Sequence, residues 1–281
     1  MSKPLHLLKV FLTPLDMLGE VVSRQRDQKR QEILDWLTPT DYTSKQADSF
    51  GRRQPGTGQW FLDSTEFKGW KGTSGQTLFC PGNPGVGKTI LTSVVIDHLT
   101  TQFSADSKTV VAYIYFSFKN NNQQKLGDIL AILLKQLSQG QPSLPEDVQK
   151  LFTKHRDQRS QPSVEELRQA LMAVSTTWRK LFILVDGLDE CRTSDGCQPR
   201  FVDTLLDIQE HSKANLFVTS RPIPEIVKNF QYAVSLEIKA AKADVGSYLD
   251  SQMGRLPECV KGEALLQEEI KKKIVEIANG M

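Results

Sequence analysis

Runs of consecutive apolar residues alternate with amphipathic segments along most of the chain. Apolar runs rich in β-branched and aromatic residues predict five buried strands, at Thr77–Cys80, Val110–Phe118, Leu181–Val185, Asn215–Thr219 and Ala233–Ile238. Apolar positions at helical spacing predict the helices between them, at Ile90–Leu99, Lys125–Leu137, Val164–Trp178 and Arg200–Glu210. Strands that are apolar throughout and separated by helices are typical of a parallel sheet covered on both faces. The pattern therefore predicts an α/β fold.

The segments before and after this α/β region do not show its alternation of apolar strands and amphipathic helices. Glu20–Trp36 is highly charged with few apolar residues, which predicts a solvated helix that Pro39 terminates. Thr38–Lys71 combines glycines and prolines with aromatic residues, so we expect a loop that packs against the fold. From Asp244 to the end the pattern is helical. We expect an N-terminal helical extension (1–37), an α/β domain with its lead-in segment (38–240), and the start of a C-terminal helical subdomain (241–281).

Composition and charge narrow the class of protein. Hydrophobic residues make up 39% of the chain and charged residues 24%, with a net charge of +2. This balance gives no electrostatic case for nucleic-acid or membrane binding. Leu5–Val22 is mildly apolar, but charged residues and Pro14 make it too broken for a signal peptide or a transmembrane helix. We expect a cytoplasmic protein, and this segment either packs on its own fold or meets a partner or membrane surface.

The four cysteines show no C-x-x-C pair. Cys191 and Cys197 are six residues apart in what the pattern predicts to be a polar loop, and no histidine lies near them. We therefore expect reduced thiols and not a metal site.

A phosphate-binding motif follows the first predicted strand. It has the pattern G-x-x-x-x-G-K-[ST] and consists of Gly82, Asn83, Pro84, Gly85, Val86, Gly87, Lys88 and Thr89. Its glycines allow backbone N–H groups to point at phosphate oxygens, while Lys88 carries a charge for the β- and γ-phosphates and Thr89 a hydroxyl for Mg²⁺. Ile90 begins the helix that adds its dipole. The alternative, a glycine-rich surface turn, is disfavoured by the strand before the motif and the helix after it.

A second candidate site follows the strand at Leu181–Val185. Asp186 ends this strand, where its carboxylate can hold Mg²⁺ or its waters. Asp189 and Glu190 come just beyond, and one of them, for which we favour Glu190, can polarise an attacking water. A solvated acidic loop is the alternative. Ligands of open α/β sheets bind at the carboxyl ends of the strands, where both motifs lie.

Arg221 follows the fourth predicted strand in the sequence Thr219-Ser220-Arg221-Pro222. A guanidinium there can contact phosphate oxygens in a bidentate manner, provided that this strand is next to the first one. A surface arginine remains the alternative interpretation.

These motifs together resemble the NACHT class of signal-transduction (STAND) P-loop NTPases. The shared residues are Pro81–Thr89, Asp186–Glu190 and Thr219–Pro222, in that order. Gly56–Leu62, followed by Phe67–Trp70, resembles the nephrocystin-3-like N-terminal NTPase segment of fungal NLR-like proteins that carry ankyrin, WD40 or TPR repeats. The resemblance covers about residues 33–281. It implies that the winged-helix and repeat regions of the family are missing from this chain.

The resemblance implies a five-stranded sheet of order 5-1-4-3-2, ATP or GTP with Mg²⁺ as ligands, and a switch between a resting form and an oligomer. It also implies that Gly58–Phe61 lines the pocket for the base, although packing is an equal alternative for Trp60 and Phe61. We expect a weak Mg²⁺-dependent NTPase that acts as a signalling switch in non-self recognition or defence. Its partners would be the nucleotide, further copies of itself, and an effector bound by the N-terminal helix.

Two other functions remain open from the sequence. The chain could be a non-catalytic module that holds nucleotide as a structural ligand. A P-loop kinase would need an acceptor pocket and a mobile lid, and the sequence gives no sign of either.

Overall fold

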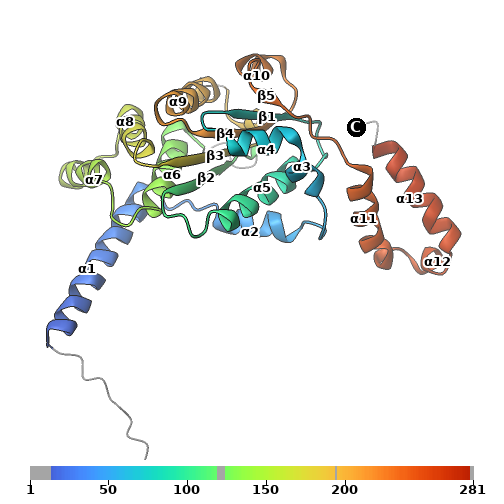
Figure 1. Cartoon of the computed structure of the whole chain (residues 1–281), viewed down its shortest axis with the longest axis horizontal. Helices are drawn as coiled ribbons and strands as arrows, with labels where there is room; N and C mark the ends of the chain where they lie inside the picture. Colours follow the sequence, from blue (N-terminus) through green and yellow to red (C-terminus); the bar gives the residue numbers. More distant parts are fainter. Residues whose placement is uncertain (1–13, 119–123, 194, 279–281) are drawn as a thin grey trace, which may run out of the picture.

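The computed structural model describes residues 14–118, 124–193 and 195–278, and its centre is a parallel sheet. The strands are β1 (Thr77–Pro81), β2 (Thr109–Tyr115), β3 (Lys180–Asp186), β4 (Asn215–Ser220) and β5 (Val234–Ser235). Their spatial order is β2-β3-β4-β1-β5 (Figure 1). This is the expected order 5-1-4-3-2 read from the other edge. The P-loop NTPase fold class is therefore confirmed.

Each face of the sheet is covered by its own set of helices. One apolar core joins the sheet to α6 (Leu126–Gln139), α8 (Val164–Ser175) and α9 (Cys197–Ser212). The other joins it to α5 (Lys88–Gln102) and the lead-in segment. Successive strand residues divide between them, since Ile183 belongs to the first core and Phe182 and Leu184 to the second. Strands buried on both faces explain the uninterrupted apolar runs of the sequence.

The lead-in segment, residues 38–76, is helical where a loop was expected. It contains α2 (Thr43–Gly51), α3 (Gln59–Asp63) and α4 (Thr65–Gly72). The expectation of packing is correct, because Phe61, Phe67 and Trp70 are all fully buried against the sheet. Burial of these rings compensates for glycines that disfavour helix, and the Ser64 hydroxyl caps α4 by accepting from the Phe67 amide.

Other boundaries also differ from the sequence prediction. β5 is limited to two residues, β2 ends at Tyr115 and not Phe118, and α8 ends at Ser175. Helices α7 (Glu146–Gln158) and α10 (Pro224–Asn229) were not predicted. The apolar face of α7 consists of Val148, Leu151 and Phe152, a stripe too narrow to stand out in a largely charged segment.

Helix α1 (Pro14–Leu37) leaves the body of the molecule and is anchored only at its end (Figure 1). Ile33 and Leu34 are buried, and the Arg30 guanidinium donates to the carbonyl oxygens of Ser138, Gln139 and Gln141 at the end of α6. Val21 and Val22 are exposed, so this part of Leu5–Val22 does not pack on the fold. The structure does not describe residues 1–13 or 279–281. The expectations for the first part of Leu5–Val22 and for the last residues of the C-terminal helical subdomain concern these residues.

Beyond β5, the chain forms α11 (Lys242–Gln252), the short turns η3 (Met253–Arg255) and α12 (Glu258–Lys261), and α13 (Ala264–Ala278). α11 and α13 lie side by side, joined by an ion pair of 2.7 Å between Lys271 Nζ and Asp250 Oδ1. Over the described stretches of chain, no helix has the length and apolar character needed to span a bilayer.

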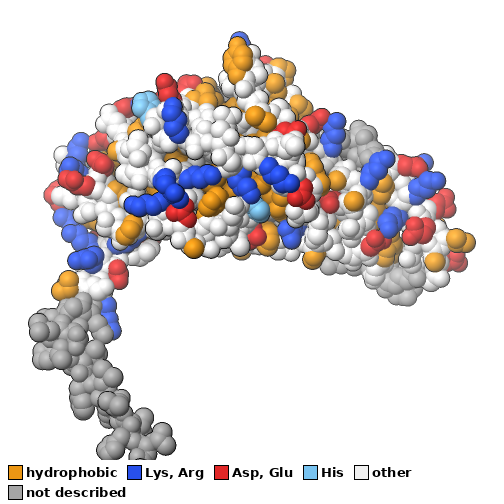
Figure 2. Space-filling model, viewed as in Figure 1, with side chains coloured by type: hydrophobic (Ala, Val, Ile, Leu, Met, Phe, Trp, Pro, Cys, Tyr) orange, Lys and Arg blue, Asp and Glu red, His pale blue; other side chains and the backbone are white. Residues whose placement is uncertain are grey.

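The positive side chains are unevenly distributed over the surface. Figure 2 shows lysines and arginines in a row across the face that α4 and α5 cover. Burial, together with neighbouring cations, lowers the pKa of Lys71 in α4 and of Lys180 at the start of β3. Lys180 Nζ donates to the Lys71 carbonyl oxygen at 2.8 Å, so the Lys180 side chain also caps the end of α4.

Candidate functional site

The predicted phosphate-binding loop connects β1 to α5. Gly85 and Gly87 have φ values of +84° and +93°, a region that other residues rarely adopt. Gly87 is the N-cap of α5, so the helix points its amide N–H groups at the loop. The ammonium group of Lys88 folds over the loop and donates to the carbonyl oxygens of Gly82 and Asn83 at 2.8 and 3.0 Å. Partial burial lowers the pKa of Lys88.

Gly82 is where the loop meets the segment after β5. The Ile238 amide donates to the Pro81 carbonyl oxygen at 2.7 Å. A Cβ atom on Gly82 would lie 2.7 Å from the Ile238 carbonyl oxygen, closer than real Cβ contacts come. Glycine is therefore required here by the close approach of two backbones.

The Asp186 carboxylate accepts hydrogen bonds from three hydroxyl groups, two of them on α5 and one on β4. It is 3% exposed and ends β3, which is separated from β1 by β4. Its Oδ2 accepts from the Thr89 hydroxyl at 2.7 Å, and its Oδ1 accepts from the Thr92 and Thr219 hydroxyls at 3.0 and 2.9 Å. Burial raises the pKa of Asp186, and the hydroxyl donors oppose this shift.

Two of these hydroxyls were not identified as site residues from the sequence. Thr92 lies three residues after Thr89 in α5, a spacing that places both on one helix face and was a usable signal. Thr219 was noted only as the start of the Arg221 motif. In the structure it also accepts from the Gly187 amide at 3.0 Å, which ties β4 to the turn after β3.

Asp189 and Arg221 form an ion pair beside the loop. Asp189 lies in the turn η2 (Leu188–Glu190), and its side chain is 2% exposed. Its Oδ2 is 2.9 Å from Arg221 Nε, and its Oδ1 accepts from the Arg221 amide at 3.0 Å. The Arg221 guanidinium is partly exposed and lies over the Phe118 ring. β4 is the neighbour of β1, which is the condition that the Arg221 prediction required.

Glu190 follows Asp189 in the same turn and makes a different contact. Its Oε2 accepts from the Phe118 amide at 3.1 Å, and the residue is half-buried. Both Asp189 oxygens are occupied by Arg221, so of the two acids Glu190 is better placed to contact a water or ligand.

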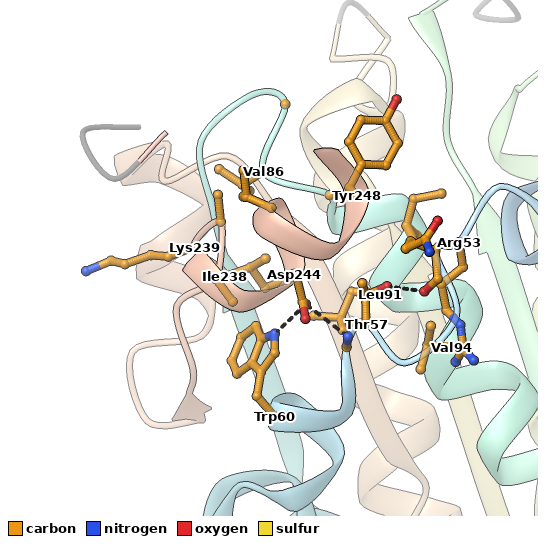
Figure 3. A pocket seen from close by; sticks show the side chains of 18 of the residues that line it. Arg53, Thr57, Trp60, Val86, Leu91, Val94, Ile238, Lys239, Asp244 and Tyr248 are labelled. Atoms are coloured by element: carbon orange, nitrogen blue, oxygen red, sulfur yellow. Dashed lines mark hydrogen bonds between the residues drawn. The ribbon is translucent and has the colours of Figure 1, made fainter. Parts of the chain in front are cut away.

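A cavity of about 310 Å³ lies beside the loop (Figure 3). Three separate segments line it: Arg52–Trp60, Gly85–Val94 and Ile238–Tyr248. Gly58 and Trp60 line this cavity, whereas Phe61 is a core residue, and Trp60 also packs against that core.

Asp244 of α11 holds two walls of this cavity together. Its Oδ2 accepts from the Gly58 amide at 2.9 Å and from the Trp60 indole Nε1 at 3.1 Å (Figure 3). More than 180 residues separate the partners, and no sequence signal connects them.

The two cysteines are buried, whereas the described residues between them form the predicted polar loop and Cys197 begins α9. Cys191 Sγ and Cys197 Sγ are 3.9 Å apart, and both residues are free thiols. The hydrogen bond from the Cys191 thiol lowers the pKa of Cys197, and the same bond and burial raise that of Cys191.

A parallel sheet of this order, with a glycine-rich loop after β1 and a buried aspartate after β3 on the same edge, defines a P-loop NTPase. Comparison with known proteins identifies the family within the P-loop NTPases to which the chain belongs. The chain belongs to the family described as "Nephrocystin 3, N-terminal", whose model matches residues 56–221. This match confirms the nephrocystin-3-like, NACHT-class resemblance of the sequence.

The chain is 24% identical over 241 residues to vegetative incompatibility protein HET-E-1 of Podospora anserina. This alignment covers 79% of the chain but only 17% of that protein. Among solved structures, domain III of the Thermotoga maritima replication initiation protein DnaA is similar at 16% identity with a TM-score of 0.42, covering 81% of this chain and 87% of that one. DnaA bound to AMPPCP and single-stranded DNA is similar at 12% identity with a TM-score of 0.42, covering 81% of this chain and 63% of that one.

Proposed function

We propose that this chain binds ATP or GTP with Mg²⁺ and hydrolyses it slowly. The observation that carries the proposal is the 2.7 Å bond between the Thr89 hydroxyl and Asp186, a contact that joins the phosphate loop to an acid two strands away. Lys88 lies on the same loop and supplies the positive charge for the β- and γ-phosphates.

Thr89 and Asp186 would hold the Mg²⁺ ion. Hydroxyl and carboxylate oxygens are the hard donors that this cation prefers, and both lie at the edge of the sheet where the phosphates would be bound. The ion would neutralise charge on the phosphate oxygens. The backbone from Gly82 to Ile90 would wrap the phosphates, with the amide groups at the start of α5 as donors.

The cavity beside the loop would hold the nucleoside. Its volume is within the range of small-molecule sites, about 300–1,000 Å³. Val86 and Ile90 come from the loop side and the indole of Trp60 from the opposite side, so a flat base would meet apolar walls.

Three further residues would act on the terminal phosphate. Glu190 would orient or polarise the attacking water. Arg221 would contact phosphate oxygens, and Asp189 would hold that guanidinium in place through the ion pair. An isolated P-loop switch without an arginine supplied in trans hydrolyses nucleotide at rates of the order of 10⁻⁴–10⁻² s⁻¹.

We further propose that this module works as the switch of a longer NLR-like protein of the cytoplasm. The support is the likeness to a protein named for vegetative incompatibility, of which the chain spans 17%. In this role, nucleotide state would control self-association, and α1, which extends from the body, would carry the contact to an effector.

The test of hydrolysis is phosphate release by the wild type and by Glu190→Gln. We expect the variant to bind nucleotide with unchanged affinity and to release phosphate about 100-fold more slowly, because it cannot polarise the water. Glu210→Gln, the same change at an exposed position of α9, serves as the control and should behave as wild type. Equal rates for Glu190→Gln and wild type, with binding intact, would favour the non-catalytic module instead.

A further inference from the structure

Helix α11, the first helix after β5, meets the body of the molecule at its surface. No residue of α11 is buried, so this helix has no apolar anchor in the core. Ile238, just before it, is buried and lies against Gly82 at the start of the phosphate loop. The next polar link along the chain is Asp244, whose carboxylate reaches the lead-in segment.

Both links line the candidate nucleoside cavity. In Figure 3 the side chains of Ile238 and Asp244 lie close to each other and to Trp60. Tyr248, one turn further along α11, also lines the cavity. A nucleoside in the cavity would therefore contact the lead-in segment, the loop and α11 at the same time.

The two hydrogen bonds that Asp244 accepts hold α11 in a defined orientation against the lead-in segment. A carboxylate that accepts from a backbone amide and an indole N–H makes two charge-assisted bonds in defined directions. Gly58, which provides the amide, has a φ of +81°, so the chain turns there in a conformation that presents its N–H to α11.

We propose that Asp244 is a positioning residue that couples nucleoside binding to the placement of helices α11–α13. The inference rests on the proposed function, because it assumes that the cavity holds a nucleoside. Asp244 holds the cavity walls together before a nucleoside binds. Binding therefore loses less free energy in ordering those walls. By reciprocity, a bound nucleoside that contacts both walls holds α11 in place.

The experiment compares wild type, Asp244→Ala, Asp244→Asn and Asp250→Ala. Asp250→Ala removes another acid of α11, one that contacts α13 and not the cavity, and is the matched control. Asp244→Asn keeps a side-chain oxygen acceptor. Three properties are measured: dissociation of a fluorescent ATP or GTP analogue, affinity for inorganic tripolyphosphate, and amide hydrogen exchange of residues 242–252 with and without nucleotide.

We expect Asp244→Ala to release nucleotide about tenfold faster and to lose the protection of residues 242–252 that nucleotide gives in the wild type. Its affinity for tripolyphosphate should be unchanged, since that ligand needs only the loop. Asp244→Asn should restore part of the slow dissociation, and Asp250→Ala should match wild type.

Two results overturn the inference alone. One is wild-type dissociation and protection in Asp244→Ala. The other is an equal loss of affinity for nucleotide and tripolyphosphate, which would indicate a general structural role. If the wild type binds tripolyphosphate but no nucleotide, the proposed nucleoside site fails, and the inference fails with it.

Discussion

Asp189 and Glu190 are adjacent acids with different surroundings. Asp189 is buried, and Arg221 occupies both of its oxygens, so replacing it would leave a guanidinium without its partner. One oxygen of Glu190 accepts from the Phe118 amide, and the residue is half-buried. From the sequence, both Asp189 and Glu190 are candidates for polarising the attacking water. The structure distinguishes them because the packing of β4 against η2 brings Arg221 to Asp189.

At the scale of single residues, Gly82 gives a direct prediction. Gly82→Ala would place a methyl group 2.7 Å from the Ile238 carbonyl oxygen, where backbone and not a flexible side chain must move. We expect the free energy of unfolding to fall by about 1–3 kcal/mol, with weaker nucleotide binding as the loop shifts. Urea unfolding and nucleotide titration measure the two effects.

Gly51→Ala is the control for this substitution. Gly51 ends α2, and a Cβ there would have no neighbour within 4 Å. The free energy of unfolding should stay within about 1 kcal/mol of wild type, in the stabilising direction. A similar loss of stability in both variants would mean that the Gly82 contact is unimportant.

At the scale of elements, the strands and longer helices were predictable because their periodicity is strong. The apolar runs at residues 181–185 and 215–219 lie within β3 and β4 as expected. The lead-in helices were not predictable, because α3 and α4 are short, α4 contains two glycines, and both are stabilised by Phe61 and Trp70 in the tertiary structure. β5 was overestimated because apolar residues such as Ile238 also serve to pack the segment that follows the strand.

The start of α8 carries a pH-dependent contribution to stability. Glu166 completes a capping box with Ser163 and also contacts Lys154 and His155. The bond from the Lys154 ammonium, together with the Ser163 donors, lowers the pKa of Glu166 well below its ordinary value of 4.5. A carboxylate with a lowered pKa stabilises the fold above the unfolded-state value, and this contribution is lost as the pH falls below it.

We therefore expect Glu166→Gln to be less stable than wild type near pH 7, with the difference shrinking as the pH falls below about 4.5. Chemical unfolding of both proteins at a series of pH values measures this. Glu165→Gln, on the exposed side of the same helix, should show a much smaller difference. A Glu166→Gln effect that is the same at every pH would show that packing, and not the charge, is responsible.

At the scale of the whole molecule, the residues of the candidate phosphate site follow from local sequence motifs, whereas most of the lining of the neighbouring cavity does not. Lys88, Thr89 and Asp186 belong to local motifs whose positions follow from the ends of parallel strands. The cavity is built from three segments far apart in the chain, joined by the contact of Asp244 with Trp60. No periodicity or motif reports such a contact, because it depends on where α11 lies after the sheet is complete.

The central claim is that the P-loop of this chain binds a nucleoside triphosphate, and titration tests it most directly. Wild type, Lys88→Ala and the exposed-lysine control Lys228→Ala would be titrated with fluorescent ATP and GTP analogues, with and without Mg²⁺. We predict saturable binding that Mg²⁺ strengthens in wild type and control, and an affinity at least about 100-fold weaker in folded Lys88→Ala. Unchanged affinity in Lys88→Ala, or no binding by the folded wild type, would contradict the account.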